Sequence, residues 1–205
     1  MNHETGAHLS LPENLPFLPG TDAAMVLPRA FAQEAKIYIY SLNLMGQAKT
    51  NHEMAILLYR QIKDRGIPCD MLVTIEAKAI ALTQELAVLL GQDYYIVLRK
   101  SVKAYMRDTL RTAVRSITTE HKQFLYLDGR DAELLKTVRH PVFIDDVIST
   151  GASFNAANSL IQESGREPLT VCACVATEGK ALEDNPRGYI RLGHLPLFNA
   201  QGEAI

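Results

Sequence analysis

Two adjacent carboxylates followed by a turn of small residues form the part of the sequence best suited to chemistry. Residues 142–153 read Val-Phe-Ile-Asp-Asp-Val-Ile-Ser-Thr-Gly-Ala-Ser, so Asp145 and Asp146 follow an apolar run that predicts a buried strand. A helix is predicted after the turn, and the peptide N–H groups at a helix start lack internal partners and favour a phosphate group. An anion cradle beside two hydrogen-bond acceptors suits a phosphorylated sugar, which carries a phosphate at one end and vicinal hydroxyls nearby.

The composition of the turn supports this interpretation. Gly151 would let the backbone approach a ligand closely. Three hydroxyl groups could act as further donors, those of Ser149, Thr150 and Ser153. The alternative is that the two acids are edge residues and that the turn is only a capped helix start. An acid or a serine at the end of a strand would, by itself, favour that alternative. The combination of strand, two acids, small-residue turn and helix start instead favours a ligand site.

Two further segments place charged residues after predicted strands. Residues 74–81 read Thr-Ile-Glu-Ala-Lys-Ala-Ile-Ala and join a strand to a helix, and residues 99–105 read Arg-Lys-Ser-Val-Lys-Ala-Tyr. Taken alone, the first segment is equally well explained as a plain strand-to-helix turn. Three cations in a polar stretch are more often a solvated loop, so the second segment by itself indicates no ligand.

Strand-like and helix-like patterns alternate along most of the chain. Strands are predicted at residues 36–41, 70–75, 94–98, 124–127, 142–144, 169–176 and 190–197, the last with a turn. Helices are predicted after a capping box at Thr50 and Glu53, and at 79–90, 132–136 and 153–164, where Gly91 and Gly165 end two of them. This alternation predicts an α/β fold with a central parallel sheet flanked by helices. Such sheets bind ligands at the carboxyl ends of their strands.

The chain divides into three parts. Residues 1–35 are predicted to be irregular because four prolines interrupt them. Residues 36–178 form the predicted core, and residues 179–205 form a C-terminal segment. Within the core, residues 99–122 are polar and show no convincing core face.

The totals exclude several classes of protein. Of 205 residues, 47% are hydrophobic and 21% are charged, which is typical of one globular domain. A net charge of −2 gives no global attraction to nucleic acid or to an anionic membrane, and no segment is long and apolar enough to span a bilayer. The N-terminal residues lack the features of a signal peptide, and the three cysteines cannot all pair. We therefore expect buried thiols and a cytoplasmic location.

Residues 142–153 resemble the phosphoribosyl-pyrophosphate-binding motif of type I phosphoribosyltransferases. That motif has hydrophobic residues, two acids, another hydrophobic residue, two variable positions, Thr-Gly, one more residue and Thr or Ser. The resemblance extends from about Ile37 to Ala176 and is closest to the adenine and xanthine branches. It implies the fold of that family, in which terminal segments form a small hood over the base.

The resemblance also implies roles for the residues of this segment. Asp145 and Asp146 would hold the ribose hydroxyls, and would meet Mg²⁺ indirectly, through substrate or water. The 5-phosphate would be bound by the turn, which comprises Val147, Ser149, Thr150, Gly151, Ala152 and Ser153.

The other two segments resemble the pyrophosphate-binding parts of the family. Glu76, Ala77, Lys78 and Ala79 occupy the place of its pyrophosphate loop, with Arg99 nearby. The family usually has glycine where this chain has Ala79, and a Cβ there could restrict φ or crowd the N–H groups that meet pyrophosphate. Lys100 and Lys103 match an Arg-Lys-x-x-Lys segment that leads into a mobile loop, which implies a catalytic role for them on the leaving group.

The resemblance implies that the protein transfers ribose 5-phosphate from phosphoribosyl pyrophosphate to a nucleobase, and that this base is a purine. It also implies a homodimer that uses Mg²⁺. The base is the least determined part. Asn43 resembles a base-contacting residue of the xanthine branch, but an asparagine that ends a strand is more often a turn residue. Phe17 could stack on a purine, although a role in the core is the favoured reading.

Two alternatives remain. One is a regulatory protein of the same fold that binds phosphoribosyl pyrophosphate without catalysis, which the alanine at position 79 favours slightly and the cationic segment disfavours. The other is a phosphohydrolase with Asp145 as nucleophile. It ranks lower, because adjacent acids in a strand point to opposite faces, whereas that chemistry requires both carboxylates on one side.

Overall fold

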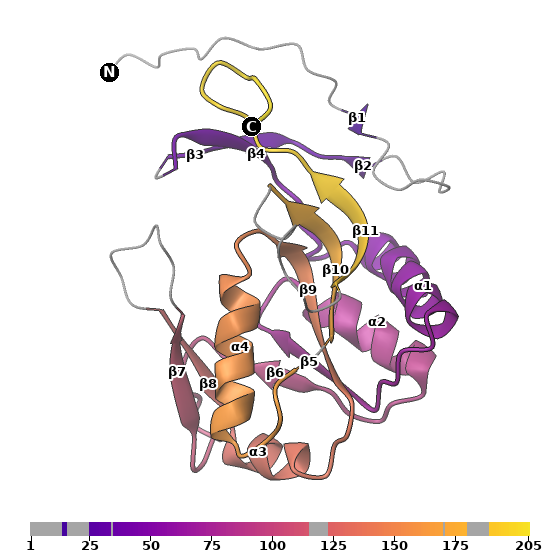
Figure 1. The fold of residues 1–205 in the computed structure, drawn as a ribbon, viewed down its shortest axis with the longest axis vertical. Coiled ribbons are helices and arrows are strands. Elements are labelled where there is room, and N and C mark those ends of the chain that lie inside the picture. Colours follow the sequence, from indigo (N-terminus) through magenta and orange to yellow (C-terminus); the bar gives the residue numbers. More distant parts are fainter. Residues whose placement is uncertain (1–13, 16–24, 34, 115–122, 170, 180–188) are drawn as a thin grey trace.

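Five parallel strands form the central sheet, in the order β11-β10-β9-β5-β6 (Figure 1). The computed structural model describes residues 14–15, 25–33, 35–114, 123–169, 171–179 and 189–205. The strands of the sheet are β5 (Met71–Ile75), β6 (Ile96–Leu98), β9 (Pro141–Ile148), β10 (Val171–Glu178) and β11 (Tyr189–Leu195). The prediction of a parallel sheet flanked by helices is therefore confirmed.

Helices cover both faces of the sheet because its central strands are apolar on both sides. These helices are α1 (Ala48–Asp64), α2 (Ile80–Leu90), α3 (Gly129–Leu135) and α4 (Ala152–Glu163). Along β9, Val142 and Ile144 belong to the core under α1 and α2, whereas Phe143 belongs to the core under α3 and α4. Cys172 and Cys174 share the second core and are buried free thiols, as their spacing predicts. A strand covered on both faces in this way is expected of a parallel sheet.

An antiparallel pair of strands lies over the carboxyl ends of β10 and β11, where Figure 1 shows it together with the C-terminal turn. It consists of β3 (Arg29–Ala32) and β4 (Ile37–Tyr40). Phe198 joins β4 through reciprocal hydrogen bonds with Tyr38, whose N–H donates at 2.8 Å and whose carbonyl accepts at 3.1 Å. We call this group the hood; it draws on both terminal segments and on β4, which the sequence placed in the core, and its role over a base stays a prediction. The first 35 residues are not wholly irregular, because they contain β3, which is largely exposed and whose strand partner within the described ranges is β4.

Another antiparallel pair, β7 (Leu110–Val114) and β8 (Gln123–Leu127), forms a separate two-stranded sheet next to β6. Arg99 and Tyr126 link the two, with the N–H of each donating to the carbonyl of the other at 2.9 and 2.8 Å. The sequence predicts β8 but not β7, because β7 alternates exposed and partly buried residues and never presents a fully buried face. The shortest pair is β1 (Asn14–Leu15) with β2 (Met25–Val26).

The start of α1 differs from the prediction. The capping box at Thr50 and Glu53 is wrong, since α1 begins at Ala48 and Thr50 lies in its first turn. Glu53 instead pairs with Lys49 at 3.7 Å along the helix surface. Buried Asn51 donates hydrogen bonds to two carbonyl oxygens of the preceding turn, which holds the helix start in place.

The ends of two core elements also differ. β9 continues to Ile148, beyond the predicted end at residue 144, so that both acids lie within the strand. β10 continues to Glu178. The C-terminal segment contributes β11 to the central sheet as well as Phe198 to the hood. None of the helices in the described ranges is long and apolar enough to cross a membrane.

Candidate active site

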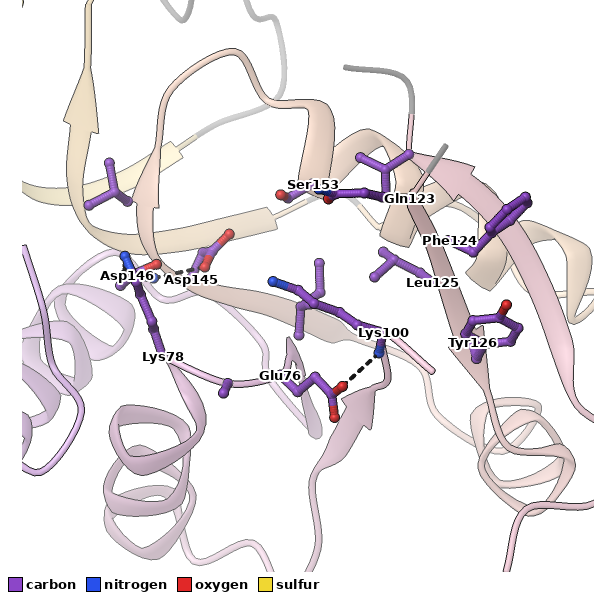
Figure 2. Close-up of a pocket in the computed structure, with 14 residues that line it drawn as sticks. Glu76, Lys78, Lys100, Gln123, Phe124, Leu125, Tyr126, Asp145, Asp146 and Ser153 are labelled. Carbon is purple, nitrogen blue, oxygen red and sulfur yellow. Dashed lines mark hydrogen bonds and ion pairs between the residues drawn. The ribbon is translucent and has the colours of Figure 1, made fainter. Parts of the chain in front are cut away.

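A cavity of about 550 Å³ opens at the carboxyl ends of β5, β6 and β9 (Figure 2). Four parts of the chain line it: residues 75–78 after β5, Lys100 after β6, Val114 and residues 123–126 of the β7–β8 pair, and residues 145–147 with Ser153 at the end of β9 and the start of α4. The three charged segments of the sequence therefore meet at one place. Their meeting follows from the order of the parallel strands, which puts β5 between β6 and β9.

The two acids lie side by side at one end of this cavity. The N–H of Asp146 donates to Oδ1 of Asp145 at 3.0 Å. Asp146 is only 7% exposed, and its Oδ2 accepts no hydrogen bond within the described part of the chain. Lys78 compensates its charge, with Nζ 3.6 Å from that oxygen. A nearly buried carboxylate oxygen without a hydrogen bond is an acceptor available to a ligand hydroxyl.

The surroundings of Asp145 disfavour the ionised form of its side chain. Burial raises the pKa of Asp145 well above its usual range, and the carboxylate of Asp146 raises it further, while Lys100 opposes both effects. A ligand that donates hydrogen bonds to this carboxylate would favour its ionised form.

We expect the Asp145→Asn variant to melt at a higher temperature than the wild type, without ligand and at neutral pH. Because the pKa of this carboxyl is raised in the folded state, the folded protein holds the proton more tightly than the unfolded chain. Ionising the group therefore costs stability as pH rises above the unfolded Asp pKa of about 3.9. The amide has no such cost and can still accept from Asp146.

Thermal unfolding measured from acidic to alkaline pH tests this expectation. The difference in melting temperature between variant and wild type should widen as pH rises from the unfolded Asp pKa of about 3.9 to the folded-state pKa of Asp145, and level off above it. A wild type that is the more stable of the two at alkaline pH would contradict it.

The turn after β9 has the features of a phosphate cradle. Gly151 has φ +73°, a left-handed conformation that only glycine adopts without strain, and α4 begins at the next residue. The N–H of Ala152 donates to the hydroxyl of Thr150 at 3.3 Å. Among the described residues, the N–H groups of Thr150, Gly151 and Ser153 have no hydrogen-bond partner. Several unpaired amides at the start of one helix favour an anion.

A carboxylate that the sequence did not single out lies beside this turn. Glu178 ends β10, and its carboxylate interacts with the side chain of Ser149. Burial raises the pKa of Glu178, while Ser149 and Lys78 oppose that effect. Its position at the carboxyl end of a buried strand was the available signal, but the predicted strand ended two residues earlier. The wall formed by β8 was missed as well.

The turn after β5 resembles a second anion cradle. The N–H groups of Ala77, Lys78 and Ala79 make no hydrogen bond within the described residues. The peptide bond between Glu76 and Ala77 is cis. Ala79 has φ −89°, which any residue adopts, and is 1% exposed. An alanine at this φ is therefore unstrained, and Ala79 does not line the cavity. The effect of the missing glycine on activity stays a prediction.

The predicted site residues separate into two groups. Those that line the cavity are Glu76, Ala77, Lys78, Lys100, Asp145, Asp146, Val147 and Ser153. Those outside its lining are Asn43, Ala79, Arg99, Lys103, Ser149, Thr150, Gly151 and Ala152, of which the last four lie in the adjoining turn. Oδ1 of Asn43 accepts the N–H of Met45 at 3.2 Å, so this side chain has the turn role that the sequence left open. Phe17 lies outside the described residues.

No protein-family model matches this sequence, and no curated protein sequence matches it. Solved structures do match. An adenine phosphoribosyltransferase from Thermoanaerobacter pseudethanolicus is 18% identical over 74% of this chain and 84% of that chain, with a TM-score of 0.58. The enzyme from Giardia lamblia, complexed with 9-deazaadenine, is 16% identical over 88% of this chain and 92% of its own, with a TM-score of 0.58.

The adenine phosphoribosyltransferase from Trypanosoma brucei, in complex with AMP, pyrophosphate and ribose-5-phosphate, also matches. It is 14% identical over 78% of this chain and 77% of that chain, with a TM-score of 0.58. Together these similarities show that the chain has the type I phosphoribosyltransferase fold.

Proposed function

We propose that this protein is a phosphoribosyltransferase that transfers ribose 5-phosphate from phosphoribosyl pyrophosphate to a purine and releases pyrophosphate. One observation carries the proposal: Asp145 and Asp146 line a cavity between the turn after β5 and the turn after β9. Both turns have N–H groups without a hydrogen-bond partner among the described residues. The donor has the same order of parts: a phosphate, two ribose hydroxyls and a pyrophosphate. Adenine is the first base to test, since the neighbouring structures are of adenine phosphoribosyltransferases.

The charges of the cavity suit a reaction in which pyrophosphate departs from C1 of the ribose. Positive charge then develops on C1 and the ring oxygen, and Asp145 and Asp146, held on the hydroxyls, would stabilise it. Negative charge grows on the leaving group, which the amides of residues 77–79 and the ammonium of Lys100 would meet. The base would attack C1, and no covalent intermediate with the protein is required.

The residues present fit a magnesium ion that the substrate carries. Mg²⁺ prefers oxygen ligands and usually keeps several waters. No cluster of three metal-binding side chains occurs in the described ranges, but Asp145 and Asp146 both line the cavity, and Oδ2 of Asp146 accepts no hydrogen bond from the described residues. These two acids would hold Mg²⁺ indirectly, through substrate or water. When bound, the ion would neutralise part of the pyrophosphate charge.

The first experiment measures pyrophosphate release from phosphoribosyl pyrophosphate and Mg²⁺ with each common purine and pyrimidine base. We expect release that depends on one or two purines. Binding of phosphoribosyl pyrophosphate by calorimetry, without release for any base, would instead favour the non-catalytic regulator. Absence of both binding and release would overturn the transferase and the regulator hypotheses together. A homodimer, which the family resemblance implies, and a cytoplasmic location, which the sequence predicts, belong to the same proposal. Light scattering tests the dimer.

A further inference from the structure

The carboxylate of Glu76 connects three walls of the cavity. Its Oε1 accepts the backbone N–H of Lys100 at 2.9 Å, and its Oε2 lies 2.7 Å from Nε of Arg99. Its own backbone N–H donates to the carbonyl of Leu98 at the end of β6 at 3.0 Å. Arg99 is in turn paired through its backbone with Tyr126 of β8. One side chain, 16% exposed, thus joins the turn after β5 to the segment after β6 and, through it, to β8.

Glu76 also forms ion pairs with two of the three cationic side chains of residues 99–103. Besides Arg99, Lys103 approaches its Oε1 with Nζ at 3.8 Å. Lys100 is different, because only its backbone N–H contacts Glu76, while its side chain lines the cavity and acts electrostatically on Asp145. Figure 2 shows the Lys100 side chain extending across the cavity in that direction, with its backbone nitrogen joined to Glu76.

By itself, a negatively charged side chain in this wall of the cavity is unfavourable for the proposed reaction. A carboxylate beside a departing pyrophosphate would oppose the charge that develops there. The two cations neutralise Glu76, so that its acceptor oxygens remain useful while its charge is balanced.

We propose that Glu76 is a positioning residue that acts through Lys100. It fixes the Lys100 backbone so that this ammonium, rather than that of Lys103 or the guanidinium of Arg99, meets the leaving pyrophosphate. The inference rests on the proposed function and changes the roles that the family resemblance gave to these residues. Glu76 itself then does not bind pyrophosphate.

A double-mutant cycle tests this assignment. Glu76→Ala should lower kcat about tenfold to a hundredfold, as displacement of a catalytic group does. The Glu76→Ala, Lys100→Ala double variant should be no slower than Lys100→Ala alone, since both changes remove the same ammonium from its place. Losses that multiply in the double variant would overturn the inference.

The Glu76→Gln variant gives a separate readout that does not depend on whether the alanine variants fold. Its amide oxygen can still accept the Lys100 N–H, so most of kcat should return. Calorimetry with inorganic pyrophosphate and Mg²⁺ should show binding at least as tight as in the wild type, because a negative charge has been removed. Weaker binding would mean that Glu76 contacts the ligand itself, which overturns the inference.

Two controls separate this inference from the proposed function. Glu133→Ala removes an ion-paired carboxylate with an exposed side chain outside the cavity and should leave kcat unchanged. A wild type without base-dependent release would overturn the proposed function, and this inference with it. An active wild type whose cycle is multiplicative overturns the inference alone.

Discussion

Replacing both Asp145 and Asp146 by asparagine should reduce base-dependent pyrophosphate release by about a thousandfold or more, since single electrostatic contacts to a transition state are worth about a hundredfold to a thousandfold. Both carboxylates line the cavity, and the nearly buried Oδ2 of Asp146 accepts no hydrogen bond from the described residues. The amides keep the shape and the acceptor oxygens but lose the negative charge that stabilises the developing cation. Steady-state rates with saturating donor and base give the comparison.

A charge-matched control removes two acids elsewhere. Asp64 and Asp93 are exposed and do not line the cavity, so the Asp64→Asn, Asp93→Asn double variant should keep wild-type rates. Full activity in the variant at 145 and 146 would place the chemistry outside this cavity. A loss of equal size in the control would show that overall charge, rather than position, matters.

Replacing Gly151 by alanine should weaken binding of phosphoribosyl pyrophosphate about tenfold to a hundredfold, the value of one or two hydrogen bonds to a charged group. At φ +73° an alanine is strained, by about 1 kcal/mol or more, and relief of that strain turns the neighbouring N–H groups away from the phosphate. Calorimetric titration with phosphoribosyl pyrophosphate measures the change, beside a thermal melt.

Gly165 provides a matched control at the other end of α4. Its φ is +85°, and an added Cβ would meet nothing within 4 Å. Gly165→Ala should therefore cost similar stability while leaving donor affinity unchanged. Equal affinities for both variants would contradict the assignment of the phosphate to the turn after β9.

Local patterns explain what the sequence could predict. The strand, two acids, turn and helix of residues 142–153 are consecutive, so periodicity and turn composition are enough to propose an anion cradle with Asp145 and Asp146 beside it. The central sheet follows from the alternation of elements. In contrast, the start of α1 depends on Asn51 reaching back to the preceding turn, which competes with the capping pattern at Thr50 and Glu53.

Contacts between separate segments explain what the sequence could not predict. The three cations at 99–103 look equivalent in the sequence, and only the position of Glu76 distinguishes Lys100 from the other two. The cavity wall formed by β8 requires a partner strand whose exposed face carries no hydrophobic signal. Whether an alanine at position 79 is strained depends on its backbone angle, which residue type alone does not determine.

Within the hood, reciprocal hydrogen bonds between Tyr38 and Phe198 join two distant parts of the sequence. During synthesis, β5, α2, β6 and β9 leave the ribosome before residue 198 exists, so the sheet edge with its acids can assemble while the hood is still incomplete. Contacts between residues so far apart also close a long loop, which slows their formation. The sheet edge that carries the two acids can thus form first, and the cover over β10 and β11 can be completed only after Phe198 has been synthesised.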